Sequence, residues 1–228
     1  MKSTGSMPWD VIALAAGLAV VMAVTDLGGQ PLRSVFALDT AKILNGEVWR
    51  LATAHLVNLS RVHTYLNVLG LCLIYVTLWS VLTLGLLARA IAGSALAISL
   101  GWVLLMPPGP TYVGFSGITH GVMAFGGLWM LRVGPRWFAL VILACLAVKL
   151  GHEIFVGAVP GADAAIGGRV SFISHALGSL GGALVATRAP MWPRAFCAGI
   201  CLALAVAQAD AERARQTVTQ IATVTHHG

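Results

Sequence analysis

A serine stands between glycines at the point where an apolar segment begins. Residues 114–117, which include Ser116, follow the turn-rich run 106–110, and the apolar segment continues to Leu131. A serine at a helix N-terminus lies where the helix dipole and free backbone N–H groups favour a developing oxyanion, although a serine that only caps a helix is common. His175 lies among small residues in another apolar segment. A serine and a histidine inside lipid indicate peptide-bond hydrolysis within a membrane.

Glycines accompany both of these residues. Gly117 and Gly121 lie beside Ser116, and Gly178 and Gly182 share a helix face with His175. Small residues let two membrane helices approach closely. We therefore expect the Ser116 hydroxyl to come within hydrogen-bond reach of His175, as a nucleophile and its base require. No carboxylate is close to His175 in sequence, so the pattern predicts a Ser–His dyad; the alternative for His175 is a packing histidine bonded across helices.

Two further polar residues, His63 and Asn67, are spaced i,i+4 at the start of another apolar segment. This spacing places them on one face of a helix. Both offer N–H donors, which at the depth of Ser116 would suit an oxyanion hole. The alternative is a polar clamp between helices.

Ionisable groups also occur in the apolar segment at 137–156, where Lys149, His152 and Glu153 lie. Such groups are costly inside a membrane and usually functional, and Lys149 and Glu153 are spaced to pair on a helix. They lie about 18–24 Å up the helix at ~1.5 Å per residue, near the expected depth of the active site. Two interpretations stay open with equal weight: a substrate-recognition group, or a structural ion pair.

The composition is that of a polytopic membrane protein. Of the 228 residues, 58% are hydrophobic and 10% are charged, and the net charge of +6 is spread along the chain. This distribution indicates membrane topology and disfavours nucleic-acid binding. The sequence has no H-E-x-x-H motif, no aspartate pair in its spans and no phosphate-binding loop, so we expect no metal and no cofactor. The four cysteines, Cys72, Cys145, Cys197 and Cys201, all lie in apolar runs and predict buried apolar side chains.

The expected fold is all-α, with one membrane domain over residues 1–228 and a core of about 8–188. Six spans are predicted at 8–25, 63–79, 89–106, 116–131, 137–156 and 170–187. An extra C-terminal helix is expected at about 193–209, followed by a tail at 210–228. The link at 26–62 mixes charged, aromatic and apolar residues, which predicts short helices in the interface with Trp49 as an anchor. The 16-residue fourth span measures about 24 Å, less than the ~30 Å hydrocarbon core, so Ser116 should lie below the outer surface.

Positive charge sets the expected orientation. With the N-terminus inside, the inner loops carry no acid and hold Lys2, Arg89, Arg132, Arg136, Arg188 and Arg194. Short inner loops with positive charge alone fit the positive-inside rule. Ser116 and His175 then lie near the outer face at similar depth.

Several of these residues together resemble a known family. Trp49-Arg50, then His63 and Asn67, then the motif Gly114-Phe115-Ser116-Gly117, then His175 with its glycines, resemble the rhomboid intramembrane serine proteases. The resemblance implies a six-helix bundle with Ser116 as nucleophile and His175 as general base. It also implies an oxyanion hole from His63, Asn67 and the Ser116 backbone N–H, with Trp49 and Arg50 in a membrane-embedded first loop.

A narrower resemblance rests on His120, which stands where many bacterial rhomboids have a tyrosine that packs against the catalytic histidine. His120, the run 45–50 and the Lys149/Glu153 pair are similar to the rhombosortase subfamily. His120 shares a face with Ser116 and can support or rival His175; we favour His175, because an i,i+4 histidine on the same helix aims poorly at the serine.

The subfamily resemblance implies a bacterial inner-membrane protein with a cytoplasmic N-terminus and an active site facing the periplasm. Its substrates would be membrane-anchored exported proteins whose C-terminal tail holds a Gly-Gly motif, a hydrophobic helix and a basic tip. The alternatives are a general rhomboid protease for other transmembrane substrates and a catalytically inactive rhomboid-like binder of membrane helices. A transporter is disfavoured, because the sequence shows no inverted repeat.

Overall fold

The computed structural model describes residues 9–107 and 109–187. The chain divides into two units, Met1–Pro190 and Met191–Gly228, and all of the described residues belong to the first. The helix expected at 193–209 and the tail at 210–228 therefore lie outside the described residues. Within the described ranges the protein is an all-α, multi-pass membrane protein, which confirms the expected fold class.

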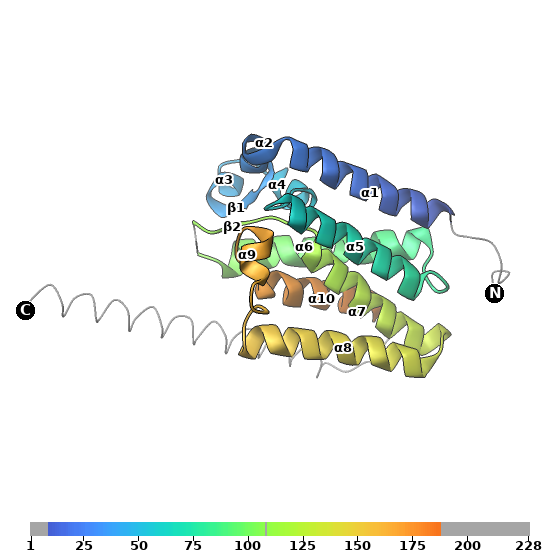
Figure 1. The fold of residues 1–228 in the computed structure, drawn as a ribbon. Coiled ribbons are helices and arrows are strands. Elements are labelled where there is room, and N and C mark those ends of the chain that lie inside the picture. Colours follow the sequence, from blue (N-terminus) through green and yellow to red (C-terminus); the bar gives the residue numbers. More distant parts are fainter. Residues whose placement is uncertain (1–8, 108, 188–228) are drawn as a thin grey trace, which may run out of the picture. The chain divides into compact units, whose positions relative to one another are not determined.

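Six long helices correspond to the six predicted spans. They are α1 (Trp9–Leu27), α5 (Arg61–Leu78), α6 (Leu84–Leu105), α7 (Ser116–Val133), α8 (Arg136–Phe155) and α10 (Phe172–Ala186). Among the described residues, α1, α5, α6 and α8 are long and apolar enough to cross a membrane by length and composition. The other two, α7 and α10, carry Ser116 and His175, and Figure 1 shows α7 between α5 and α8.

The helix boundaries differ from the sequence prediction by at most two residues, except at the start of the third span. The third span begins at Leu84, five residues early, because Thr83 caps it: the Thr83 hydroxyl accepts from the Leu86 N–H at 3.3 Å. Arg89, expected in a loop, consequently lies inside α6. The fourth span has 18 residues, about 27 Å at ~1.5 Å per residue, where 16 were expected. The shortest of the six is instead α10, with 15 residues.

Short elements fill the first loop, as the sequence predicted. They are α2 (Gly29–Phe36), β1 (Leu38–Asp39), α3 (Thr40–Leu44), α4 (Arg50–Thr53) and the 3₁₀ helix η1 (Ala54–Leu56). The strand β1 pairs antiparallel with β2 (Thr111–Tyr112), and a further short helix, α9 (Ala162–Ile166), precedes α10. The β1–β2 pair joins the first loop to the segment that leads into Ser116.

A buried arginine holds the first loop together. Arg50 is 3% exposed, and its guanidinium donates to the Ser34 and Ala37 carbonyls at 2.9 and 2.7 Å while it pairs with Glu47. Trp49, the expected interfacial anchor, is 47% exposed, and its indole N–H donates to the Val35 carbonyl. The loop is thus a folded unit in which Trp49 and Arg50 bond to backbone carbonyls in and beside α2.

His55 connects the first loop to α6. Its Nε2 lies 3.0 Å from the Ser99 hydroxyl, whose own proton goes to the Leu51 carbonyl at 2.6 Å. Burial lowers the pKa of His55 to about 4, so the ring is neutral at ordinary pH. A neutral ring that donates from Nε2 satisfies the serine oxygen without placing a charge in the core.

The centre of the bundle is the contact between α7 and α10. Gly117 and Gly121 on α7 face Gly178 and Gly182 on α10, and a methyl group at Gly178 or Gly182 would strike the carbonyl group of Gly117 or Gly121. This confirms that the glycines let the two backbones touch. The backbone contact brings the residues of the N-terminal turns of both helices together.

We expect Gly178→Ala to lower the stability of the fold by about 1–3 kcal/mol, because the added methyl group overpacks a backbone contact. Thermal unfolding in detergent measures the change. The control is Gly85→Ala in α6, where an added Cβ meets nothing within 4 Å and stability should hold or rise. Equal melting temperatures for the two variants would contradict the close contact.

Candidate active site

Ser116 is the first residue of α7, and the strand β2 leads the chain to it. Gly114, two residues before it, has φ +121°, a conformation that favours glycine. The Gly114 N–H donates to the Ala54 carbonyl at 3.0 Å, and the Tyr112 hydroxyl donates to the Gly114 carbonyl at 2.7 Å. Burial raises the pKa of Tyr112, which keeps that hydroxyl a donor. The turn that presents Ser116 is therefore fixed on both sides.

The structure brings Ser116 and His175 together. The Ser116 Oγ and the His175 Nε2 are 3.0 Å apart, although 59 residues separate them in sequence. His175 is 5% exposed and lies in the first turn of α10. The distance agrees with the expectation drawn from the glycines on the two helices.

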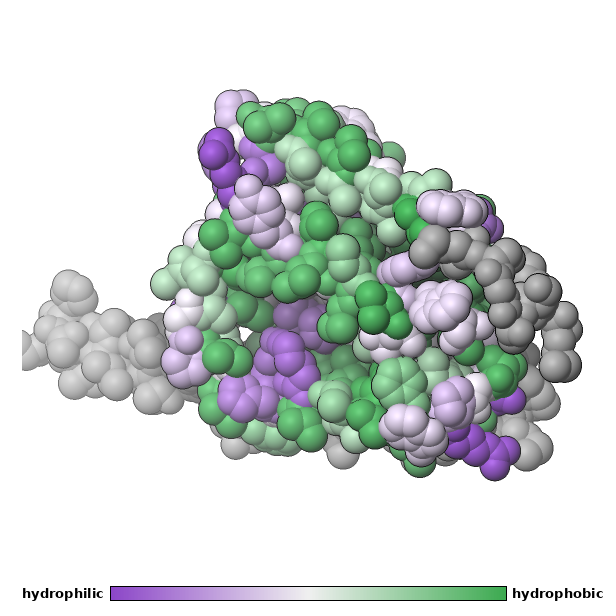
Figure 2. Space-filling model, turned by 45° about the vertical axis from the view of Figure 1, so that its right-hand side comes forward, coloured by the Kyte–Doolittle hydropathy of each residue, from purple (hydrophilic) through white to green (hydrophobic). Residues whose placement is uncertain are grey.

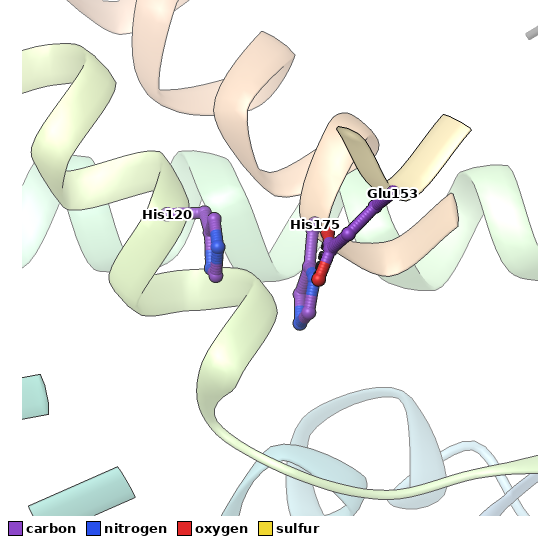
Figure 3. Close-up of side chains that lie close together, drawn as sticks. All are labelled: His120, Glu153 and His175. Atoms are coloured by element: carbon purple, nitrogen blue, oxygen red, sulfur yellow. Dashed lines mark hydrogen bonds and ion pairs between the residues drawn. The ribbon is translucent and has the colours of Figure 1, made fainter. Parts of the chain in front are cut away.

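A carboxylate stands behind His175. The Glu153 Oε2 lies 2.7 Å from the His175 Nδ1, and Glu153 is 4% exposed. The sequence predicted a two-residue arrangement, because no acid is close to His175 along the chain. The packing of α8 against α10 brings the Glu153 carboxylate to His175, although the two residues are 22 positions apart in sequence. Figure 3 shows this carboxylate beside the His175 ring.

Glu153 has a second partner on its own helix. The Lys149 ammonium pairs with Glu153 Oε1, which confirms the predicted i,i+4 ion pair. The lysine side chain is 45% exposed and that of the glutamate 3%. His152, the third ionisable residue predicted here, is exposed, and its side chain joins neither partner within the described part of the chain. The carboxylate thus divides its two oxygens between a lysine and a histidine.

His120 covers the face of the His175 ring. The two rings stack with centroids 4.0 Å apart and planes 12° from parallel, as Figure 3 shows. The His120 Nδ1 lies 2.7 Å from the Ser116 carbonyl, so this nitrogen carries a proton and donates to the backbone. His120 thus packs against His175, and its Nδ1 is bonded to the backbone.

His120, Glu153 and His175 have the residue types of a metal site, and their ligand atoms lie within 4.8 Å of one another. Both nitrogens of His175 are, however, bonded to other groups of the chain. Rings stacked face to face also hold their lone pairs in parallel planes, which do not converge on one ion. The cluster is arranged for hydrogen bonding and does not fit a metal.

The predicted oxyanion donors lie beside this group. His63 and Asn67 are 7% and 3% exposed. The Leu59 backbone N–H donates to the His63 Nδ1 at 3.2 Å, which makes Nδ1 an acceptor and places the proton of the neutral ring on Nε2. A Cβ on Gly114 would lie 3.0 Å from that Nε2 and 3.9 Å from the Asn67 Nδ2. Gly114 thus leaves space where the two donors meet the turn before Ser116.

Sequence reasoning missed Asn58. Its side chain is 2% exposed, and its Oδ1 accepts from the Asn67 Nδ2 at 2.6 Å. Its backbone carbonyl accepts from the Arg33 Nε at 2.7 Å, which ties it to α2. The available signal was a single polar residue within the apolar run 56–59.

The surface around the bundle is largely hydrophobic. Figure 2 shows green side chains over most of one face, with hydrophilic side chains gathered in a hollow. Large apolar side chains on the outside of several helices, including Leu73, Val76, Leu140 and Val148, are 57–72% exposed within the chain. Lipid contact accounts for such a surface, because these helices have spanning length and composition.

The model of the rhomboid domain matches residues 45–190, well over half of the chain. The chain belongs to the rhomboid family. Rhomboids are generally serine proteases that act on membrane proteins within the lipid bilayer. The matched region begins just before Trp49 and Arg50 and contains Ser116, Glu153 and His175. A comparison with curated proteins finds no match.

Proposed function

We propose that this rhomboid is an active intramembrane serine protease in which Ser116 is the nucleophile and His175 the general base. The observation that carries the proposal is the 3.0 Å distance between the Ser116 Oγ and the His175 Nε2. A hydroxyl at this distance from an imidazole nitrogen is the arrangement that nucleophilic catalysis requires. A catalytically inactive binder of membrane helices has no need for it.

The reaction follows from the bonds around the two residues. As the Ser116 Oγ attacks the scissile carbonyl carbon, its proton passes to the His175 Nε2. His175 then gives this proton to the leaving amine, the C–N bond breaks, and an acyl-enzyme on Ser116 remains. Water attacks the ester with His175 as base, and release of the acid restores the serine.

The oxyanion of each tetrahedral intermediate requires donors that are already in place. His63 offers Nε2–H, because Leu59 occupies its Nδ1, and Asn67 keeps one amide N–H free of Asn58. The Ser116 backbone N–H, in the first turn of α7, supplies the third donor. We therefore favour an oxyanion hole over a purely structural polar clamp as the role of His63 and Asn67.

For the substrate, we propose the C-terminal sorting tail of an exported, membrane-anchored protein, with cleavage in or near a Gly-Gly segment. His120 against His175 and the Lys149/Glu153 pair support the rhombosortase-like assignment. Glycine suits a scissile segment that must leave its helix, because it disfavours helix by ~1 kcal/mol relative to alanine. The proposed setting is a bacterial inner membrane, with the N-terminus in the cytoplasm and the site facing the periplasm.

Purified wild-type protein should react with a fluorophosphonate probe, and Ser116→Ala should abolish the labelling. His175→Ala should slow it by about 10²–10⁴-fold, the usual contribution of a general base. In-gel fluorescence against time measures the rate, with Ser34→Ala in α2 as the matched serine control. Labelling that persists in Ser116→Ala, or a folded wild type that never reacts, would count against the protease.

Asn58→Ala should lower kcat by about tenfold with little change in KM, because Asn67 loses the bond that orients it. In an Asn67→Ala background the same change should have no further effect, since Asn58 acts through Asn67. Cleavage kinetics of the four forms measure this coupling, and Asn45→Ala, at the end of α3, is the control. If the two substitutions lower kcat independently, so that their effects multiply in the double variant, Asn58 does not act through Asn67.

A model substrate with a Gly-Gly tail should be cut, and replacing Gly-Gly by Leu-Leu should reduce cleavage by at least about tenfold, because leucine holds the segment helical. Immunoblotting of the released ectodomain measures the product. Equal cleavage of both tails would favour the general rhomboid protease over the sorting enzyme.

A further inference from the structure

We propose that Glu153 is a third member of the proteolytic machinery, a positioning residue that orients His175, and that Lys149 holds its carboxylate in place. This inference rests on the proposed protease function. It extends the dyad predicted from the sequence to a serine–histidine–glutamate triad whose members lie on α7, α10 and α8.

The first argument concerns the proton on His175. An ionised carboxylate accepts hydrogen bonds and donates none, so Glu153 Oε2 at 2.7 Å requires a proton on Nδ1. The other nitrogen, Nε2, then presents its lone pair to the Ser116 hydroxyl at 3.0 Å. A general base needs this tautomer, and the carboxylate selects it.

The second argument concerns charge. When Ser116 attacks, His175 becomes an imidazolium at a position that is 5% exposed. An unpaired charge in such a place is strongly disfavoured. The Glu153 carboxylate lies in contact with the ring where that charge appears, and its stabilisation grows as the proton arrives.

The third argument concerns Lys149. A carboxylate as buried as that of Glu153 resists ionisation unless a cation accompanies it. The Lys149 ammonium pairs with Oε1 and leaves Oε2 for His175. The lysine side chain is 45% exposed and that of the glutamate 3%, so the carboxylate that faces His175 is the buried member of the pair. The Lys149–Glu153 ion pair thus orients the carboxylate towards His175 and also links two turns of α8.

His120 completes the restraint on the ring. The hydrogen bond from Nδ1 to Glu153 fixes the imidazole within its plane, and the stacked His120 ring blocks movement out of that plane. These two contacts come from α8 and α7, whereas His175 itself lies on α10. The base is therefore held from three helices.

The competing role for Glu153 is a structural ion pair with Lys149, and four variants separate the two. We expect Glu153→Gln to lower kcat at least 100-fold with KM within about threefold of wild type, since the corresponding carboxylate-to-amide change in a serine protease triad costs about 10⁴. Glu153→Asp should regain at least about tenfold over Glu153→Gln. Lys149→Met should be less harmful than Glu153→Gln, and the Lys149→Met/Glu153→Gln double variant should be as slow as Glu153→Gln.

A structural pair gives the opposite pattern. Lys149→Met would then be as harmful as Glu153→Gln, and the double variant, in which no charge stays unpaired, would recover towards wild type. Either result would overturn the proposal, as would wild-type kcat in Glu153→Gln. The acid control is Asp10→Asn, because Asp10 bonds to the neighbouring Val11 N–H far from this group in sequence.

Two further measurements distinguish the proposed role of Glu153 from misfolding of the variants and from failure of the protease proposal. In a His175→Ala background, Glu153→Gln should leave the residual labelling rate unchanged, because Glu153 acts through His175. A further fall there would assign Glu153 another role and overturn the proposal. If wild type itself fails to label at Ser116, the protease proposal fails first, and this outcome is distinct from any difference among the Glu153 variants.

Discussion

The backbone contact between α7 and α10 is the constraint on which the rest of the site depends. Where glycines face each other on the two helices, carbonyl groups of α7 occupy the space where methyl groups on α10 would stand. At this separation a serine on one helix and a histidine on the other can share a hydrogen bond of 3.0 Å. The remaining helices add groups to this pair: α8 brings the carboxylate and α5 the donors.

Much of this arrangement could be predicted from the sequence because it obeys local rules. Apolar length predicted the six spans, and helical spacing placed the glycines beside Ser116 and His175 and paired Lys149 with Glu153. The mixed composition of residues 26–62 predicted short interfacial helices. In each case the partners are close in sequence, or the pattern repeats with the period of the helix.

The parts that could not be predicted depend on contacts between distant segments. Glu153 reaches His175 because α8 packs beside α10, and no spacing rule links residues 22 positions apart across a loop. Asn58 contacts Asn67 because the first loop folds back against α5, and the Arg33 side chain donates a hydrogen bond to the Asn58 carbonyl. The predicted start of α6 was wrong for another reason: hydrophobicity alone does not mark a helix start, whereas Thr83 begins the helix by capping it.

The position of α10 along the chain has a consequence for biosynthesis. Ser116 and His120 emerge from the ribosome first, then Lys149 and Glu153, and His175 arrives last of the group. In the proposed protease, Ser116 therefore has no base, and Glu153 has no histidine partner, until α10 has been made and has packed against α7. On the proposed mechanism, a chain that lacks α10 has no general base and cannot hydrolyse other proteins inserted beside it.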